Sequence, residues 1–255
     1  MSRRNKTRVG LKLSLLGLLA AGAAGLFARA GAADWQTASR APVGLAPDPV
    51  THAEAIVQVY AARTWGWRGA FGVHSWIAVK PSDAKQYVVT EVIGWRARRG
   101  LPVVVNSDRA PDARWFGNAP ELLAEMRGEG VDAVIEKIAA AVETYPYPLD
   151  YTMWPGPNSN TFIAHVARQV PELRLELPPT AIGKDFLPDG ALLAETPSGT
   201  GWQLSLYGLF GVSLAREEGI EVNLLGLSFG LSPRGPALKL PLAGRLGPDK
   251  VKREG

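Results

Sequence analysis

Three residues in this sequence have the types and the spacing for nucleophilic catalysis. His74 lies in an apolar, β-branched run, and Ser159 lies where a helix is expected to begin. A hairpin turn centred between positions 82 and 83 would place Glu91 opposite His74 on the same side of a sheet. Glu91 can then orient the imidazole, which can accept the proton of a serine hydroxyl. The sequence therefore predicts a triad of Ser159, His74 and Glu91 for hydrolysis or acyl transfer.

The predicted helix start allows a catalytic and a structural interpretation of Ser159. The positive end of the helix dipole favours a developing anion, and backbone N–H groups near Asn160 would supply the oxyanion site. Ser and Asn are also preferred N-cap residues, so Asn158 and Ser159 can serve as a cap alone. A strand histidine beside a glutamate can equally be a structural hydrogen-bonded pair. Catalysis requires Ser159 within reach of His74 in an open cleft, whereas a buried serine spent on capping favours the structural role.

Other motifs in the chain are weaker. Residues 226–230 fit the Gly-x-Ser-x-Gly formula, but Pro233 and Pro236 follow where a nucleophile elbow needs a helix. The Ser-x-x-Lys match at residues 82–85 falls in the predicted hairpin turn, and His165 lies on a different helical face from Ser159. The histidines have no ligand spacing and the chain has no cysteine, so we predict neither a metal nor a cofactor.

These residues need a mixed scaffold of strands and helices to position them. Apolar periodicity and turn residues predict a hairpin from 70–80 and 87–95, a third strand at 101–106, and long paired strands at 202–215 and 220–231. The 3.6-residue period and helix caps predict helices at 119–127, 131–144 and from Ser159 or Asn160 to about Val170. The expected fold class is α+β, an antiparallel sheet with packed helices.

The N-terminus has the pattern of an export signal. Basic residues precede an apolar run from Leu13 to Phe27, and small residues follow it. We therefore divide the chain into a signal peptide or membrane anchor at 1–32, an irregular lead-in at 33–50, a single α+β domain at 51–243 and a polar tail at 244–255. The predicted location is the periplasm, either free or anchored to the membrane through the N-terminus. The sequence does not settle the oligomeric state.

Charge and composition narrow the partners. The first 30 residues hold six of the 28 Lys and Arg and no acid, so the rest carries 22 basic against 24 acidic side chains. Without a net basic field or a nucleic-acid module, we do not expect a nucleic-acid partner. The eight tryptophans pack in the core and loops or line an aromatic groove for an envelope small molecule, a lipid or a glycan.

Several segments carry a resemblance to a known family. The segments Val73-His74-Ser75-Trp76-Ile77-Ala78-Val79, 114–121 (RWFGNAPE), 154–162 (WPGPNSNTF), 179–185 (PTAIGKD) and 198–203 (SGTGWQ) resemble the bacterial domain-of-unknown-function family numbered 3750, over roughly residues 50–245. That resemblance implies no established activity.

A more distant resemblance suggests a chemistry. A strand histidine followed by Asn158-Ser159-Asn160-Thr161-Phe162 is similar to the circularly permuted papain-like amidases and acyltransferases, whose pattern is Asn-Cys-Asn-x-Phe. The resemblance implies a permuted papain-like fold, with His74 as the base and Ser159 in place of the cysteine. A serine hydroxyl must lose its proton in concert with a base, whereas a thiol can be held as a thiolate. The resemblance thus implies a serine-dependent hydrolase or acyltransferase, or a non-catalytic envelope protein that kept the cleft for binding.

Overall fold

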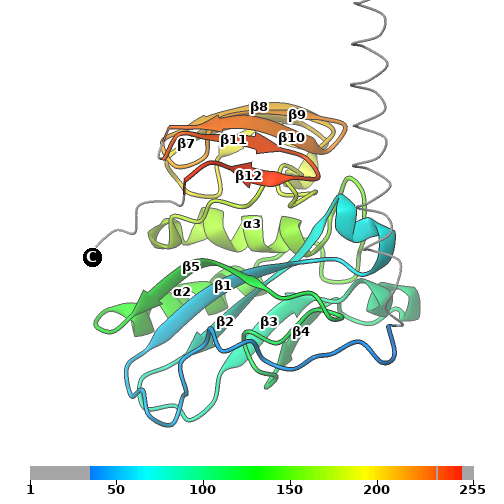
Figure 1. Cartoon of the computed structure of the whole chain (residues 1–255). Helices are drawn as coiled ribbons and strands as arrows, with labels where there is room; N and C mark the ends of the chain where they lie inside the picture. The colour runs from blue at the N-terminus through cyan, green and yellow to red at the C-terminus, as the bar shows by residue number, and fades with distance from the viewer. Residues whose placement is uncertain (1–34, 234, 249–255) are drawn as a thin grey trace, which may run out of the picture.

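The computed structural model describes residues 35–233 and 235–248. Within them the chain forms two antiparallel sheets, two α-helices and short 3-10 turns, which confirms the α+β fold class. One sheet has five strands and the other has seven, and helix α3 lies between the two (Figure 1). The predicted signal or anchor at 1–32 lies outside the described residues. Among the residues that are described, no helix is long and apolar enough to cross a membrane.

The five-stranded sheet carries the predicted hairpin at its centre. Its order is β4 (Val104–Ser107), β3 (Val88–Val92), β2 (Val73–Lys80), β1 (Ile56–Arg63) and β5 (Glu121–Arg127). Strands β1 and β2 are buried along almost their whole length, because apolar clusters cover both faces of the sheet. Strand β1, for which the sequence analysis gave no element, lies between β2 and β5.

Two helices cover one face of this sheet. Helix α2 (Val131–Glu143) follows the predicted apolar stripe and packs on α3 (Ser159–Gln169), which in turn packs on β2. A buried cluster that includes Ile77, Phe162 and Val166 joins α3 to the sheet. Burial of these apolar side chains fixes the helix start against the first residues of β2.

The predicted helix at 119–127 is wrong, because this segment forms strand β5. Its residues are good helix formers, but Leu122 to Arg127 pair with β1 along its open edge. Pairing with a buried strand outweighs a local helix propensity of a few tenths of a kcal/mol per residue. Just before this strand, Asn118 exchanges two backbone hydrogen bonds with Trp115 in a tight turn.

The seven-stranded sheet is a simple meander in which each strand pairs with the next. Its strands are β6 (Leu193–Glu195), β7 (Gly201–Leu206), β8 (Phe210–Ala215), β9 (Gly219–Leu224), β10 (Leu227–Ser232), β11 (Ala237–Leu240) and β12 (Gly244–Leu246). The two long strands expected from the sequence are therefore two hairpins. Gly208 and Gly226 take positive φ angles of 67° and 77° in the turns that divide them. The expected polar tail also begins too early, since Gly244–Leu246 form β12.

This sheet has an unusual distribution of polar and apolar side chains. Alternate residues of β7 to β10 point to opposite faces, and the buried ones are polar, including Gln203, Ser213, Glu221 and Asn223. The buried face lies over α3 and the loop 174–187, whose Lys184 contributes to a network of buried charges (Figure 1). The exposed residues of the same strands are apolar, which reverses the usual arrangement of a half-buried sheet.

Candidate functional site

His74 and Glu91 are in direct contact at the start of the hairpin. The His74 Nε2 lies 2.7 Å from the Glu91 Oε2, and both residues are buried. The predicted register is wrong by two residues, because Trp76 and not His74 stands opposite Glu91. A slip of two residues keeps every side chain on its original face of the sheet, so the diagonal pair still meets.

Arg109 is a third member of this cluster. Its Nε donates to the Glu91 Oε1 at 3.0 Å, and its guanidinium lies 4.6 Å from the ring centre of Trp76. Burial alone would raise the pKa of Glu91, but the hydrogen bonds and charges of His74 and Arg109 outweigh it and lower the pKa to about 2. Glu91 is therefore ionised at neutral pH.

The buried imidazole of His74 is held as a neutral base. Burial lowers the pKa of His74, and this effect outweighs the opposing attraction of Glu91. With Glu91 ionised and acting only as an acceptor, the Nε2 of His74 carries the proton and donates it to the carboxylate. The remaining nitrogen, Nδ1, makes no hydrogen bond to any described residue and keeps its lone pair for accepting a proton.

Aromatic rings fix the plane of this imidazole. Trp115 stacks on His74 with ring centres 3.7 Å apart and an interplanar angle of 15°. Trp95 stacks in turn on Trp115, and the ring centre of Trp76 lies 5.8 Å from that of His74 and 6.4 Å from that of Trp115. The histidine can therefore rotate little, so the direction of its Nδ1 is set by packing.

Ser159 stands at the first position of α3, and Asn158 does the capping. The Asn158 Oδ1 accepts from the N–H groups of Asn160 and Thr161 at 2.9 and 3.2 Å, and the Thr161 hydroxyl accepts from the Asn158 N–H. The Ser159 hydroxyl is not used in the cap, and it makes no hydrogen bond within the described part of the chain. Ser159 is buried, with only 3% of its surface exposed. The structural role foreseen for its hydroxyl, capping the helix, is thus taken by its neighbour.

The expected oxyanion donor changes as well. The Asn160 N–H is bonded to the Asn158 side chain, so it is not available to a substrate. The Ser159 N–H makes no hydrogen bond among the described residues, so it can serve in its place at the helix N-terminus. The Asn160 side chain instead bonds to the carbonyls of Val73 and Ile182 and to the hydroxyl of Ser75, which ties α3 to β2.

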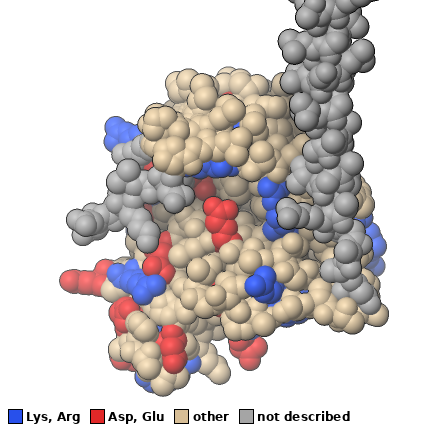
Figure 2. Space-filling model, viewed as in Figure 1, with Lys and Arg blue, Asp and Glu red and all other residues tan. Residues whose placement is uncertain are grey.

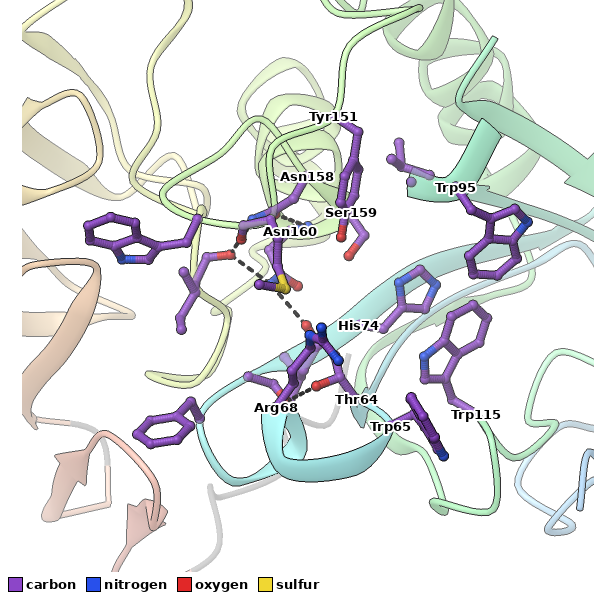
Figure 3. Close-up of a pocket in the computed structure, with 18 of the residues that line it drawn as sticks. Thr64, Trp65, Arg68, His74, Trp95, Trp115, Tyr151, Asn158, Ser159 and Asn160 are labelled. Atoms are coloured by element: carbon purple, nitrogen blue, oxygen red, sulfur yellow. Dashed lines mark hydrogen bonds between the residues drawn. The ribbon is translucent and has the colours of Figure 1, made fainter. Parts of the chain in front are cut away.

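Ser159 and His74 line one cavity of about 990 Å³. In Figure 3 both side chains point into it, with Tyr151 beside Ser159 and Trp115 beside His74. No hydrogen bond joins the serine and the histidine in the described structure, as is common for catalytic pairs without a bound substrate. The walls are mainly aromatic, and six tryptophans line them: Trp35, Trp65, Trp67, Trp95, Trp115 and Trp154.

Sequence reasoning missed Arg109, the stacking of Trp115 and the position of Tyr151. Arg109 follows β4 in a loop, and only the spatial pairing of β3 with β4 brings it to Glu91. Ser82 and Ser228, from the two weaker motifs, lie in the β2–β3 turn and on β10, outside this cavity. Within 35–233 and 235–248, no three His, Asp or Glu side chains are placed to hold a metal ion.

The fold and this cavity define an α+β protein with a buried His–Glu pair and, at a helix start, a serine whose hydroxyl takes no part in the cap. The chain belongs to the family described as "Protein of unknown function (DUF3750)", whose model matches residues 54–186. This range includes His74, Glu91 and Ser159 but ends before β6, so it is shorter than the expected 50–245. No curated protein and no solved structure matched the chain. The papain-like resemblance therefore stays a prediction.

Proposed function

We propose that this protein is a serine-dependent hydrolase or acyltransferase that acts on an ester or amide of an apolar acyl group. The observation that carries the proposal is the unused hydroxyl of Ser159 in the same cavity as a neutral His74, whose Nε2 is held by Glu91. A cap alone would not need this serine, because Asn158 forms both side-chain bonds to the helix start.

The proposed reaction uses these groups in two steps. The Ser159 Oγ attacks the acyl carbonyl while the His74 Nδ1 takes its proton, and the Glu91 carboxylate stabilises the imidazolium through Nε2. The Ser159 N–H donates to the oxyanion. His74 then protonates the leaving alcohol or amine, which leaves an acyl ester on Ser159. A water or a second alcohol or amine, deprotonated by His74, attacks that ester. His74 then returns this proton to the departing Ser159 Oγ, which releases the acid, ester or amide product and restores the serine.

The cavity supports an apolar acyl group as the part of the substrate that is recognised. A volume of about 990 Å³ is at the upper end of the range for small-molecule sites, and its aromatic walls offer few hydrogen-bonding groups. Arg68 and Arg98 also line it and are exposed, so they can contact a polar or anionic head group. A lipid fits this distribution better than a glycan, which requires many polar partners.

The sequence adds a proposed location. The basic start and the apolar run Leu13 to Phe27 support export, with the domain in the periplasm and free or anchored to the membrane. An acyl substrate would then come from the cell envelope.

Labelling with a fluorophosphonate serine probe tests the proposed activity. The full chain is compared with Ser159→Ala, His74→Ala and the control Ser82→Ala, whose serine lies in the β2–β3 turn. We expect Ser159→Ala to abolish labelling, His74→Ala to slow it by about 10²-fold or more, and Ser82→Ala to leave it unchanged. Labelling that survives Ser159→Ala, or none at all in folded protein, contradicts the proposal.

A second function is favoured by the depth of the site. Ser159 is almost fully buried in an aromatic cavity that is large enough for an acyl chain, which also suits a non-catalytic lipid-binding protein of the envelope. Binding of a fluorescent fatty acid separates the two. Binding that is equal in wild type and Ser159→Ala, together with an unlabelled serine, favours this second function.

A further inference from the structure

The seven-stranded sheet presents a continuous apolar face to the outside. This outer face consists of every second residue of β7 to β11, counted from Trp202, Phe210, Ile220, Leu227 and Leu238 to the end of each strand. The strand registers place all of these residues on one side. All fourteen are Leu, Ile, Val, Phe or Trp, and twelve of them are more than a third exposed. A monomeric protein in water rarely exposes so large an apolar surface.

The opposite, buried face of this sheet carries charged side chains that pair with one another. Lys239, fully buried, bonds to Glu176 and Glu221 at 2.5 and 2.7 Å, and Glu221 also accepts from Lys184 at 2.5 Å. The sheet thus turns its charges inward and pairs them there, while its outer positions carry none in β7 to β11. In Figure 2 the upper part of the molecule, over this sheet, is drawn mainly in the tan of uncharged residues. On edge strand β6, Glu195 stands opposite Trp202 and so places a charge on the outer side at the edge of the sheet.

We propose that the outer face binds the surface of a lipid bilayer, with its side chains in the hydrocarbon region. Protein interfaces are ringed by polar residues and contain about one hydrogen bond per 100 to 200 Å². Of the fourteen side chains of the outer face, only the Trp202 indole can donate a hydrogen bond and none can accept one, so its chemistry complements hydrocarbon. The backbone groups of the inner strands are paired within the sheet, as an apolar solvent requires.

The surroundings of the outer face fit the same occupant. Leu225, in the turn between β9 and β10, is exposed. Together with Leu227 it lines the cavity that holds Ser159. Trp154, half exposed at the same rim, donates its indole N–H to the Leu225 carbonyl at 2.9 Å. Two exposed arginines, Arg68 and Arg98, line the same cavity. Tryptophans and arginines are the residues that proteins place at the level of lipid head groups.

The sequence independently brings this domain to a membrane. The basic residues and the apolar run Leu13 to Phe27 direct the chain to a bilayer whether the segment is cleaved or retained. The sheet would then provide a second contact, separate from the N-terminal one. This inference concerns a surface outside the catalytic groups and holds whether or not Ser159 is reactive.

The lack of native cysteine allows a direct test by spin labelling. The full chain carries a nitroxide at Val212→Cys or Leu231→Cys on the outer face, or at Lys85→Cys in the β2–β3 turn as the control. Each variant is bound to vesicles of phosphatidylethanolamine and phosphatidylglycerol, isolated by flotation, and checked for folding by circular dichroism. Electron paramagnetic resonance then compares collisions of the label with oxygen, which enters lipid, and with a nickel chelate, which stays in water.

We expect several-fold higher relative oxygen access at Val212→Cys and Leu231→Cys than at Lys85→Cys. Equal access to the nickel chelate at all three positions would overturn the proposal, as would failure of the protein to float. Labels shielded from both reagents and broadened by a neighbouring nitroxide would also overturn it, because they would show a second copy on this face. The variant Ser159→Ala should give the same oxygen access, so loss of catalysis and loss of lipid contact remain separate results.

Discussion

At the residue scale, the protein holds His74 as a neutral base beside Glu91 rather than as the cation of an ion pair. His74 is buried, and its lowered pKa keeps it neutral at pH 7 although it touches an ionised Glu91. Arg109 supplies the compensating charge for that carboxylate from the other side. The cluster therefore has one negative and one positive charge at rest and gains a second positive charge only when His74 takes a proton. That order suits a general base.

The proposed base predicts the pH dependence of serine labelling. Since the neutral imidazole is the active form and its pKa lies below 6.5, the rate should be full at pH 7 and fall only at lower pH, with a midpoint below 6.5. Glu91→Gln removes the attraction that raises this pKa, so the midpoint should move further down and the maximal rate should drop about 10²-fold or more. Rates measured from pH 4 to 8 check both effects. A midpoint at or above 6.5 in the wild type would contradict the assignment.

Unfolding in urea tests the lowered pKa of His74 without a measurement of activity. The folded pKa of His74 is below its unfolded value, so its contribution to stability is present above pH 6.5 and is lost as the pH falls through the folded pKa. The contribution of Glu91 is present above its unfolded pKa of 4.5 and is lost as the pH falls toward 2. The urea midpoint should therefore be lower at pH 4 than at pH 7.

At the scale of elements, the pairing of strands determines structure that local propensity does not. The contact between His74 and Glu91 could be predicted because the side-chain period of a strand is two, so an error of two residues in the register does no harm. The helix expected at 119–127 failed because nothing in its own residues reveals the open edge of β1. Arg109 could not be found for the same reason, since its position depends on β4 lying beside β3.

The strand pattern of the last third shows a second limit of the sequence. Alternation of apolar and polar residues from Trp202 onward predicts strands, but it does not say which face is buried. Here the buried face is the polar one, because Lys184 and Lys239 find carboxylates there. Likewise the start of α3 could be predicted from Asn158-Ser159, but only the structure separates the capping residue from the one that is left unused.

The buried charges under the seven-stranded sheet predict an unequal response to loss of a lysine. Lys239→Met leaves Glu176 and Glu221 buried without that cation and should destabilise the protein by about 3 to 5 kcal/mol. The matched control Lys137→Met removes an exposed partner of Glu172 and should cost about 1 kcal/mol or less. Urea unfolding of both variants at pH 7 measures the difference. Equal losses would show that the inner charges contribute no more than a surface pair.

At the scale of the whole molecule, the predicted export segment and the two proposed sites lie in different parts of the chain. The N-terminal segment that predicts export lies outside the described residues, whereas the cavity and the outer face lie within them. The family match covers the five-stranded sheet and α3 but not the seven-stranded sheet. The candidate active site thus belongs to the matched region, and the proposed lipid contact belongs to the rest of the chain.

Export can be tested without the folded domain. Residues 1–33 fused to an alkaline phosphatase that lacks its own signal should give an active enzyme in a bacterial host, because phosphatase folds only after translocation to an oxidising compartment. The control Leu15→Arg with Leu16→Arg interrupts the apolar run and should abolish activity. An inactive wild-type fusion, with the protein present in the cells, would count against export.

The stacking of Trp115 on His74 also provides a way to observe the base directly. A ring centre 3.7 Å above an indole places the imidazole protons inside the shielding cone of the aromatic current. The chain has only three histidines, so the imidazole signals in a proton magnetic resonance spectrum are few, and those of His74 should be displaced upfield from the others. Its protonation can then be followed in the unmodified protein, before any substrate is known.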